Sequence, residues 1–555
     1  MKILLLISSF NNLSQSVYCK LVELNYSVYI KFAISEELTK QAVEEINPDL
    51  IFCPYLKEYI SKDIYINTPT FILHPGPIGD RGPQSLDNAI NNEVKQWGVV
   101  ILQANEELDG GDIYASSNFT MRNTSKASIY RNEVNKATLK ALDEFLTNYK
   151  NEDFIPRKQI LNPIHTKLTQ ENRKINWDKD TNKEILRKIN MSDSYPGVKD
   201  ELLGSKCYLY SAYIEDTLKG KPKEVIAKRD GAICIGTCDG SIWISQIREE
   251  NSFKLPATYV LKEKIKGIQE KRIALVLEEE INTFYELRVN RKDEVAYLFF
   301  NFHNGAMTSA QCIKLKYAIE YLKETCKVLV LCGGDDFFCN GIHLNILEDS
   351  KKQGEDGWSN INAMNEAVQA VINCDEILTI ASFCKNSGAG GVFLGLACDY
   401  ALACEDVVFN PHYKTLGLSG SEYHTFTLPK RVGELKAKEL LEKCLPINST
   451  QALKINMIDE VFDFSNYDLK LDAFTKTLYE DEEKYEELID KKKDFLFENY
   501  EVMENCKNEE LKIMYDEFWD KNSSFHKLRF NFVHKTKPLS TPKRLNHPIK
   551  NSLNE

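Results

Sequence analysis

The sequence lacks a long apolar run and a basic face. No uninterrupted stretch of apolar residues approaches the roughly 20 that a membrane-spanning helix needs. The 555 residues carry a formal net charge of −12, whereas a nucleic-acid binder more often presents a basic stripe or patch. We therefore expect neither a membrane nor a nucleic acid as a partner, and the acidic balance is typical of a solvated surface.

The sequence also lacks the cysteine spacing of a zinc site. Its 15 cysteines are odd in number and scattered, and no Cys-x-x-Cys pair occurs. Thiols distributed in this way are typical of reduced, mostly buried side chains in a cytoplasmic protein. We therefore expect a cytoplasmic protein without a metal site.

What is present is an alternation of short apolar strands with helical segments, in a chain long enough for three or four domains. In residues 1–150 this is the βαβ rhythm of an open α/β sheet, with all of its strands expected to be parallel. Residues 151–275 contain short strand-like pieces between glycines, which favours a small β-barrel-like module. Residues 276–535 return to alternating strands and helices and end in a charged helical extension. The Pro-, Lys- and Asn-rich residues 536–555 are expected to form a loose tail.

The first turn of the chain contains no glycine, so the dinucleotide-binding fingerprint is absent. The first chemical signal comes later, where an apolar strand ends in His74 and enters the loop HPGPIGDRGP. About 35 residues further on, Asp109 precedes two glycines. An imidazole at the carboxyl end of a strand is a suitable general base, and a carboxylate beside it can orient it. A strand cap at His74 and a turn at Asp109 would explain the same residues without chemistry.

The spacing of these residues resembles the 10-formyltetrahydrofolate formyltransferase family. The shared pattern is His-Pro-x-x-x-x-x-Arg-Gly, followed by Gly-Val-x-x-x-Gln and Leu-Asp-x-Gly-Asp-Ile. The resemblance implies a Rossmann-like formyltransferase domain in which His74 and Asp109 are catalytic. The family has Asn two residues before the His, where this chain has Ile72. The group that polarises the formyl oxygen is therefore open among Ser85, Arg81 and a backbone N–H.

The same resemblance implies a folate site, with 10-formyltetrahydrofolate as the formyl donor. The family's folate loop corresponds to residues 48–60. The implied folate-binding residues are Cys53, Pro54, Leu56, Arg81 and Gly82. Residues 167–198 further resemble the opening of the β-rich carboxy-terminal domain of the family.

Two further glycine-containing turns, in residues 328–345 and 379–400, each follow a strand and open toward a helix. Backbone N–H groups held in this way can face one carbonyl oxygen, although tight packing of helix on strand would use the same glycines. Both segments resemble the crotonase (enoyl-CoA hydratase/isomerase) superfamily, over about residues 290–465. The resemblance implies a ββα-repeat fold and substrates that are thioesters of coenzyme A. It assigns the two N–H donors to Ile342 and Gly390.

The crotonase-like segment departs from the hydratases at their acid–base residues. One hydratase glutamate corresponds to Phe393, and the other falls near His412 or Tyr413, so hydration by two carboxylates is not expected. Tyr413 and Glu422 are instead the candidate catalytic pair, because a phenol and a carboxylate can share a hydrogen bond or relay a proton. Aromatic packing of a helix against a loop is the alternative interpretation of this segment.

The combination of the two modules resembles the HypX-type hydrogenase maturation factors over nearly the whole chain. This resemblance implies a bifunctional formyltransferase and formyl-CoA decarbonylase, that is, a lyase, with coenzyme A as carrier. The product would be carbon monoxide for the active-site iron of NiFe-hydrogenase, and hydrogenase maturation proteins are the expected partners. Two alternatives stay open: a formyl-CoA or acyl-CoA hydrolase, and a non-catalytic folate-binding maturation scaffold, which Ile72 would suit.

Overall fold

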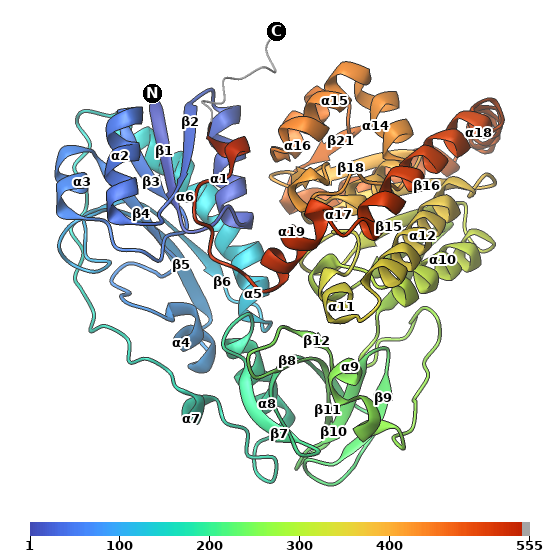
Figure 1. The fold of residues 1–555 in the computed structure, drawn as a ribbon, viewed down its shortest axis with the longest axis horizontal. Helices are drawn as coiled ribbons and strands as arrows, with labels where there is room; N and C mark the ends of the chain where they lie inside the picture. Colours follow the sequence, from blue (N-terminus) through green and yellow to red (C-terminus); the bar gives the residue numbers. More distant parts are fainter. Residues whose placement is uncertain (547–555) are drawn as a thin grey trace. The chain divides into compact units, whose positions relative to one another are not determined.

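The computed structural model of the chain describes residues 1–546, which form two compact units (Figure 1). Unit 1 comprises Met1–Lys271, Ile281–Phe284 and, of the residues after unit 2, the described residues 537–546. Unit 2 comprises Arg272–Glu280 and Tyr285–Thr536. Among the described residues, no helix has both the length and the apolar composition needed to cross a bilayer.

The first sheet of unit 1 has six strands in the order β2-β1-β3-β4-β5-β6. They are β1 (Lys2–Ile7), β2 (Ser27–Phe32), β3 (Leu50–Cys53), β4 (Thr70–His74), β5 (Gln96–Gln103) and β6 (Ile113–Thr120). β1 to β4 are parallel, as expected for short, continuously apolar strands. β5 runs antiparallel to β4, so the prediction of an all-parallel sheet was wrong at this strand. After β4 the chain stays at the carboxyl end of the strands, where it forms a loop, and does not cross back over the sheet.

The helices of unit 1 connect and cover its two sheets. They are α1 (Asn12–Glu23), α2 (Glu36–Ile46), α3 (Lys62–Asn67), α4 (Ser85–Asn91), α5 (Lys126–Ile129), the π-helix η1 (Tyr130–Val134), α6 (Asn135–Lys150), α7 (Gln170–Arg173), α8 (Asn182–Ser192), α9 (Ala257–Leu261), and the 3-10 helices η2 (Lys262–Ile265) and η6 (Lys543–Leu545). The ring of Phe145 on α6 packs on Phe52 of β3 and Phe71 of β4, with centroid distances of 5.6 and 4.6 Å. These buried rings fix α6 on the sheet at the two strands that carry the candidate site.

The second sheet of unit 1 is antiparallel, in the order β7-β8-β11-β10-β9, with β12 paired to β11. Its strands are β7 (Val198–Leu202), β8 (Ser205–Glu215), β9 (Val225–Arg229), β10 (Ala232–Gly236), β11 (Ser241–Glu249) and β12 (Leu255–Pro256). The strands, α8 and α9 pack around one cluster of buried, mostly aliphatic side chains. The short strands predicted between glycines in residues 151–275 correspond to β7 to β12.

A buried cluster of opposite charges ties the helices of unit 1 together. The Asp87 carboxylate on α4 accepts hydrogen bonds from Lys126 Nζ and Arg173 Nη2, both at 2.7 Å. Arg173 is wholly buried, and its Nη1 also donates to the Met191 carbonyl and the Ser192 hydroxyl. Removing one partner of such a cluster leaves an uncompensated buried charge. Asp87 therefore holds α4, and the loop before it, against α7.

The main sheet of unit 2 has the order β13-β14-β15-β16-β18-β21, and a small second sheet has the order β17-β19-β20. The strands are β13 (Leu287–Lys292), β14 (Val295–Phe300), β15 (Val328–Gly333), β16 (Leu378–Phe383), β17 (Ser387–Gly388), β18 (Tyr400–Cys404), β19 (Val408–Asn410), β20 (Ile447–Asn448) and β21 (Glu460–Phe462). From β14 to β21 the main sheet is parallel. These strands alternate with helices, as predicted for residues 276–535.

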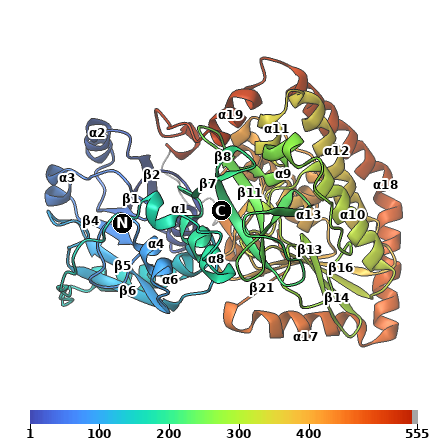
Figure 2. The same ribbon diagram turned by 90° about the horizontal axis from the view of Figure 1, so that it is seen from below.

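The helices of unit 2 include the charged extension predicted from the sequence. They are η3 (His303–Gly305), α10 (Ser309–Lys323), α11 (Leu344–Asp349), α12 (Gln353–Ile372), α13 (Gly390–Leu396), η4 (Lys414–Leu416), α14 (His424–Val432), α15 (Glu434–Lys443), α16 (Ser449–Lys454), η5 (Phe464–Asn466), α17 (Tyr467–Tyr479), α18 (Glu482–Trp519) and α19 (Ser524–Val533). The 38-residue α18 runs along one side of unit 2 (Figure 2) and contacts α12, α14 and α17. It thereby reaches the helices that carry the candidate site of this unit.

The last described residues return to unit 1, where η6 lies beside β2. The hydroxyl of Thr541 accepts a hydrogen bond of 2.9 Å from the N–H of Phe32, and Leu545 is buried. Residues 537–546 therefore differ from the loose tail expected for 536–555. The physical reason is that β2 is an edge strand, whose free backbone groups need partners. The remainder of that predicted tail lies outside the described residues.

Candidate functional site

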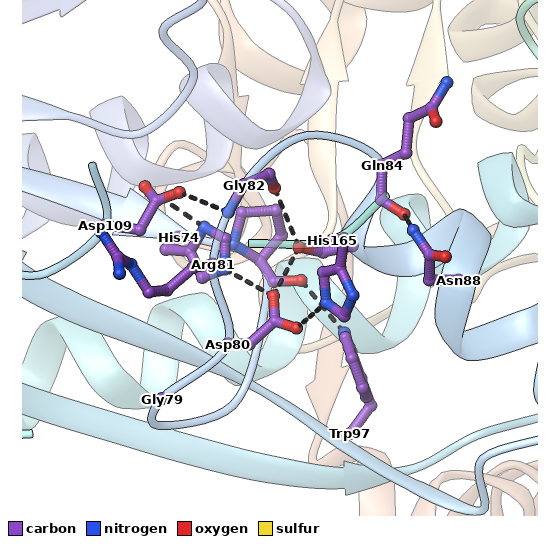
Figure 3. A network of polar contacts seen from close by, with 12 residues as sticks. His74, Gly79, Asp80, Arg81, Gly82, Gln84, Asn88, Trp97, Asp109 and His165 are labelled. Carbon is purple, nitrogen blue, oxygen red and sulfur yellow. Dashed lines mark hydrogen bonds and ion pairs between the residues drawn. The ribbon is translucent and has the colours of Figure 1, made fainter. Parts of the chain in front are cut away.

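The first candidate site lies in unit 1, at the carboxyl end of β4 (Figure 3). His74 is the last residue of this strand and is 6% exposed. The following loop folds back near the ring, because Trp97 Nε1 donates to the Pro75 carbonyl at 3.0 Å. A turn then brings the N–H of Asp80 within 2.9 Å of the Pro77 carbonyl. The imidazole is thus held where open α/β sheets bind their ligands.

Asp80 is bonded on both of its carboxylate oxygens. His74 Nε2 lies 2.7 Å from Oδ2, and the Ser85 hydroxyl donates to the same oxygen. The other oxygen, Oδ1, contacts Nε2 of His165. Burial alone would raise the pKa of Asp80, but the hydrogen bonds from these three side chains outweigh it and hold the pKa below its usual value. The ionised carboxylate can only accept, so each imidazole presents an N–H to it.

Gly76 makes the contact between Asp80 and His74 possible. A Cβ at this position would lie 2.2 Å from Asp80 Oδ2 and 2.5 Å from His74 Nε2. Any side chain here would therefore force the carboxylate and the imidazole apart.

Asp109 faces the other nitrogen of the His74 ring. Its Oδ1 lies 3.5 Å from His74 Nδ1, and its Oδ2 accepts a hydrogen bond of 3.0 Å from the N–H of Gly82. Asp109 has a φ of +51°, a conformation that aspartate tolerates better than most residues. The second glycine after Asp109 is required, because a Cβ on Gly111 would lie 1.7 Å from the Gln103 carbonyl oxygen. The structure thus places the two predicted catalytic residues together, with one carboxylate on each side of the ring.

The five predicted folate-binding residues fall in two neighbouring places. Arg81 and Gly82 lie in the loop after β4, and Arg81 donates to a backbone carbonyl of the segment before β6. Cys53 is the last residue of β3 and belongs to an apolar cluster against which Leu56 packs, with Pro54 directly after the strand. Because β3 and β4 are adjacent, both groups lie at the same edge of the sheet.

Ile72 lies two residues before His74 and packs against aliphatic side chains of β5 and β6. It offers no side-chain hydrogen bond at the place where the formyltransferase family has Asn. The Ser85 hydroxyl is bonded to Asp80, and the Arg81 guanidinium is bonded to the segment before β6. Both side chains considered as substitutes are therefore already engaged within the protein.

Sequence reasoning missed Asp80 and His165. Asp80 stands inside the motif that marks the site, but the family pattern gives that position no fixed residue. His165 lies 85 residues further along, in an irregular segment without any periodicity. That segment follows the loop, because the N–H of Asn162 donates to the Gly79 carbonyl at 3.1 Å and the N–H of His165 to the Arg81 carbonyl at 3.2 Å. The available signal was a histidine in a chain with only nine of them.

The second candidate site lies in unit 2, where two strand-to-helix turns meet. The N–H of Met307 donates to the Gly341 carbonyl at 2.8 Å, and the N–H of His343 donates to the Met307 carbonyl at 3.0 Å. The N–H of Ile342, between these two bonds, therefore points to the opposite side. Gly390 is the first residue of α13, so its N–H has no partner inside the helix. A Cβ on Gly341 would lie 3.3 Å from the Gly390 nitrogen, so the two predicted donors belong to adjacent turns.

Tyr413 and Glu422 are in direct contact in this site. The phenol donates to Glu422 Oε2 at 2.6 Å, and both side chains are buried. A Cβ on Gly390 would lie 2.5 Å from Glu422 Oε1, so the carboxyl group lies against the predicted N–H donor. Burial raises the pKa of Glu422 to about 7, although the Tyr413 hydrogen bond and the nearby His424 lower it. Burial also raises the pKa of Tyr413. Glu422 can therefore take up and release a proton near neutral pH while the phenol stays protonated.

Aromatic rings enclose the Tyr413–Glu422 pair. Phe393 stacks on Tyr413 with a centroid distance of 5.5 Å, and the His424 ring lies 5.2 Å from the phenol ring. Phe393 thus forms an apolar wall at the position where the hydratases have a glutamate. His424 Nδ1 lies 3.2 Å from Glu510 Oε1, so α18 supplies a second buried carboxylate.

Two supporting residues of this site were also missed. Asn365 on α12 accepts a hydrogen bond from the N–H of Glu422 and donates to the Ser421 hydroxyl, at 3.1 and 3.0 Å. Glu510 accepts one of 3.0 Å from the N–H of Tyr423. Glu422 and Tyr423 have φ values of +64° and +58°, so these bonds hold a strained turn in place. Asn365 and Glu510 occupy ordinary helical patterns, which give no sign of a distant partner.

No group of three or more His, Cys, Asp or Glu residues within residues 1–546 is arranged to hold a metal ion. Residues 292–522 match the family described as enoyl-CoA hydratase/isomerase, and residues 167–264 match the formyl transferase C-terminal domain. These matches confirm the two kinds of domain predicted from the sequence.

Individual relatives extend the likeness to the whole chain. The hydrogenase maturation factor HoxX of Bradyrhizobium diazoefficiens is 34% identical, over 98% of this chain and 96% of that protein. The crystal structure of HypX from Aquifex aeolicus in complex with tetrahydrofolic acid is 41% identical, covers 98% of each chain and gives a TM-score of 0.96. A methionyl-tRNA formyltransferase of Pseudothermotoga lettingae is 24% identical, over 40% of this chain and 76% of its own length.

Proposed function

Because the chain belongs to the HypX and HoxX family of hydrogenase maturation factors, we propose that it makes carbon monoxide for the active-site iron of NiFe-hydrogenase. It takes the formyl group from 10-formyltetrahydrofolate, transfers it to the thiol of coenzyme A and decomposes the formyl thioester. Its partners are then hydrogenase maturation proteins, and its place is the cytoplasm. The observation that carries the proposal is the buried Tyr413–Glu422 pair against Gly390, in a domain related to enzymes that act on coenzyme A thioesters.

His74 and Asp109 carry the formyl transfer. As the thiol sulfur bonds to the formyl carbon, His74 takes the thiol proton, and it returns that proton to the folate nitrogen when the carbon–nitrogen bond breaks. Asp109, 3.5 Å from the ring, stabilises the imidazolium formed in between. The HypX structure from Aquifex aeolicus holds tetrahydrofolic acid, which supports a folate donor here. The residues that would contact the folate are Cys53, Pro54, Leu56, Arg81 and Gly82.

Tyr413 and Glu422 carry the decarbonylation. The N–H groups of Ile342 and Gly390 hold the thioester oxygen and so position the formyl group. Glu422 removes the formyl proton, and the electrons of that C–H bond become the lone pair on the carbon of carbon monoxide. The carbon–sulfur bond breaks with its electrons on sulfur, and the thiolate is protonated from the Tyr413–Glu422 pair. A carboxyl group with a pKa of about 7 can both accept and return this proton at neutral pH.

The enclosure of the pair favours decarbonylation over hydrolysis. Phe393 and His424 pack on the Tyr413 ring, and we infer that this enclosure keeps bulk water from the carboxyl group. A hydrolase would need such a water next to Glu422. The hydrolase is therefore the second candidate, and its product identifies it.

The test is to supply the protein with 10-formyltetrahydrofolate and coenzyme A and to measure both products. Carbon monoxide is read from the difference spectrum of haemoglobin, and formate is measured separately. We expect carbon monoxide in proportion to the tetrahydrofolate released. Formate without carbon monoxide would establish the hydrolase instead, and folate binding without turnover would establish the scaffold.

Two variants assign the steps to the two sites. His74→Ala should abolish product from 10-formyltetrahydrofolate but leave carbon monoxide release from added formyl-CoA intact. Glu422→Gln should lower carbon monoxide release from both substrates by about 10²–10⁴-fold. The exposed Glu483→Gln is the matched control for the second variant and should behave as the wild type. Equal carbon monoxide release by Glu422→Gln and wild type would remove Glu422 from the mechanism.

A further inference from the structure

We propose that Asp80 and His165 are positioning residues for formyl transfer, which together hold His74 as the tautomer whose basic nitrogen is Nδ1. The proposal rests on the proposed formyl transfer and specifies how this chain orients the base of that reaction. It places part of the catalytic assembly in the irregular segment that follows the first sheet.

The tautomer follows from the bonds of Asp80. One carboxylate touches two imidazoles, His74 Nε2 at 2.7 Å through Oδ2 and His165 Nε2 through Oδ1 (Figure 3). The Ser85 hydroxyl adds a further hydrogen bond to Oδ2. An ionised carboxylate has no proton to donate, so both ring nitrogens must donate to it. A neutral His74 then carries its proton on Nε2 and its lone pair on Nδ1.

The Nδ1 of His74 is also the nitrogen that faces the predicted partner Asp109. The 3.5 Å between Nδ1 and Asp109 Oδ1 is longer than the 2.7 Å on the Asp80 side, as expected when Nδ1 carries no proton to donate. When Nδ1 accepts the proton of the attacking thiol, it gains a donor that Asp109 can stabilise. The proton then passes from Nδ1 to the folate nitrogen as the carbon–nitrogen bond breaks, so the transfer balances without an oxidant or a reductant.

The two residues that orient the His74 ring, Asp80 and His165, come from irregular segments and not from β4. Ile72, on the same strand as His74, contributes only apolar contact. The segment containing His165 is instead fixed on the loop after β4, through the bonds from Asn162 to Gly79 and from His165 to Arg81. The His165 side chain is 30% exposed, whereas that of Asp80 is 5% exposed. Asp80 thus connects the buried imidazole of His74 to the partly exposed imidazole of His165.

A cavity of about 240 Å³ lies beside the second imidazole. Its lining includes Asp80, His165, Asn88, Trp97 and Asn162. A cavity of about 150 Å³ is enough to hold benzene in a protein interior. Free imidazole is smaller than benzene, so it should be able to reach Asp80 when the His165 side chain is removed.

The decisive variants are Asp80→Asn and His165→Ala. Asp80→Asn should lower kcat for formyl transfer by about 10²–10⁴-fold, because the amide no longer imposes one tautomer on His74. His165→Ala should lower kcat by roughly tenfold or more, with the KM for 10-formyltetrahydrofolate nearly unchanged, and added imidazole should restore much of the loss. A purely structural role of His165 would not respond to imidazole. The half-buried His526→Ala in unit 2 is the matched control and should show neither effect.

Release of carbon monoxide from added formyl-CoA should be unchanged in all of these variants, which assigns any loss of turnover to unit 1 and the formyl transfer step. The tautomer is read independently from the ¹⁵N resonances of the His74 ring, assigned by comparison with His74→Asn. We expect a protonated Nε2 and an unprotonated Nδ1 in the wild type, and a loss of that preference in Asp80→Asn. This measurement stands even if the wild type transfers no formyl group, so failure of the proposed function and failure of this inference are distinguishable. A protonated Nδ1 in the neutral ring, or wild-type kcat in Asp80→Asn, would overturn the inference.

Discussion

Replacing Glu422 by Gln is expected to stabilise unit 2 at alkaline pH and not at acid pH. Burial raises the pKa of this carboxyl group from 4.5 to about 7. In the unfolded chain the group ionises near pH 4.5, and in the folded chain only near pH 7. Between these values the folded state binds more protons than the unfolded state, so the stability of the wild type falls as the pH rises. Gln does not titrate, so the variant lacks this loss.

The size of the effect follows from the two pKa values. A rise from 4.5 to about 7 corresponds to about 3 kcal/mol. This loss of stability of the wild type is absent below pH 4.5 and complete above pH 7. Gln keeps an oxygen that can accept the hydrogen bonds of Tyr413 and the Ser421 N–H, so the contacts of the site are retained. Since one kcal/mol moves the Tm of a domain of about 150–250 residues by about 2–4 °C, the variant should gain about 6–12 °C at pH 8.

The assay is differential scanning calorimetry of the wild type and Glu422→Gln from pH 4.5 to pH 8. The transition that moves on substitution belongs to unit 2, because Glu422 lies there. The exposed Glu483→Gln should follow the wild type at every pH. A difference in Tm between wild type and Glu422→Gln that stays constant across this range would refute the raised pKa. The expected gain in stability accompanies a loss of carbon monoxide release, as is common for strained catalytic groups.

Three further substitutions test other parts of the structure. Tyr413→Phe removes a hydrogen bond that lowers the pKa of Glu422, so the midpoint of the pH–rate profile for carbon monoxide release should move to higher pH; an unchanged midpoint would contradict this. Gly390→Ala places a Cβ 2.5 Å from Glu422 Oε1 and should lower carbon monoxide release, measured with added formyl-CoA, by about tenfold or more; wild-type rates would argue against the close approach. Asp87→Ala leaves the wholly buried Arg173 without its carboxylate. It should lower the free energy of unfolding of unit 1, measured by urea titration, by about 3–5 kcal/mol. A decrease of less than about 1 kcal/mol would mean that the guanidinium finds another partner.

The parts of the fold and of the sites that depend on local pattern could be predicted from the sequence. The apolar run before His74 placed that residue at the end of a buried strand, and the glycines after Asp109 indicated a tight turn. Tyr413 and Glu422 are nine residues apart, within one short segment, so their contact needed no knowledge of distant pairing. The family resemblance then gave these residues their roles.

The parts that depend on pairing between distant segments could not be predicted. The direction of β5 is set by the path of the loop after β4, and strand pattern alone does not distinguish the two directions. The contact of Asp80 with His165 joins a glycine-rich loop to a segment without regular structure. Glu510 reaches the second site from a long helix whose charged pattern is typical of a solvent-exposed face. Each of these groups becomes recognisable only when its partner is known.

The return of residues 537–546 to the edge strand β2 bears on how the protein is made and how its gene can be divided. During synthesis, the hydrogen bond from the Phe32 N–H to Thr541 can form only after all of unit 2 has left the ribosome. Unit 1 therefore begins to fold first and is completed last. A stop codon placed directly after unit 2 would remove a covering segment from the other unit. The coding sequence therefore cannot be divided by a single cut into two proteins that each keep all the contacts of their unit.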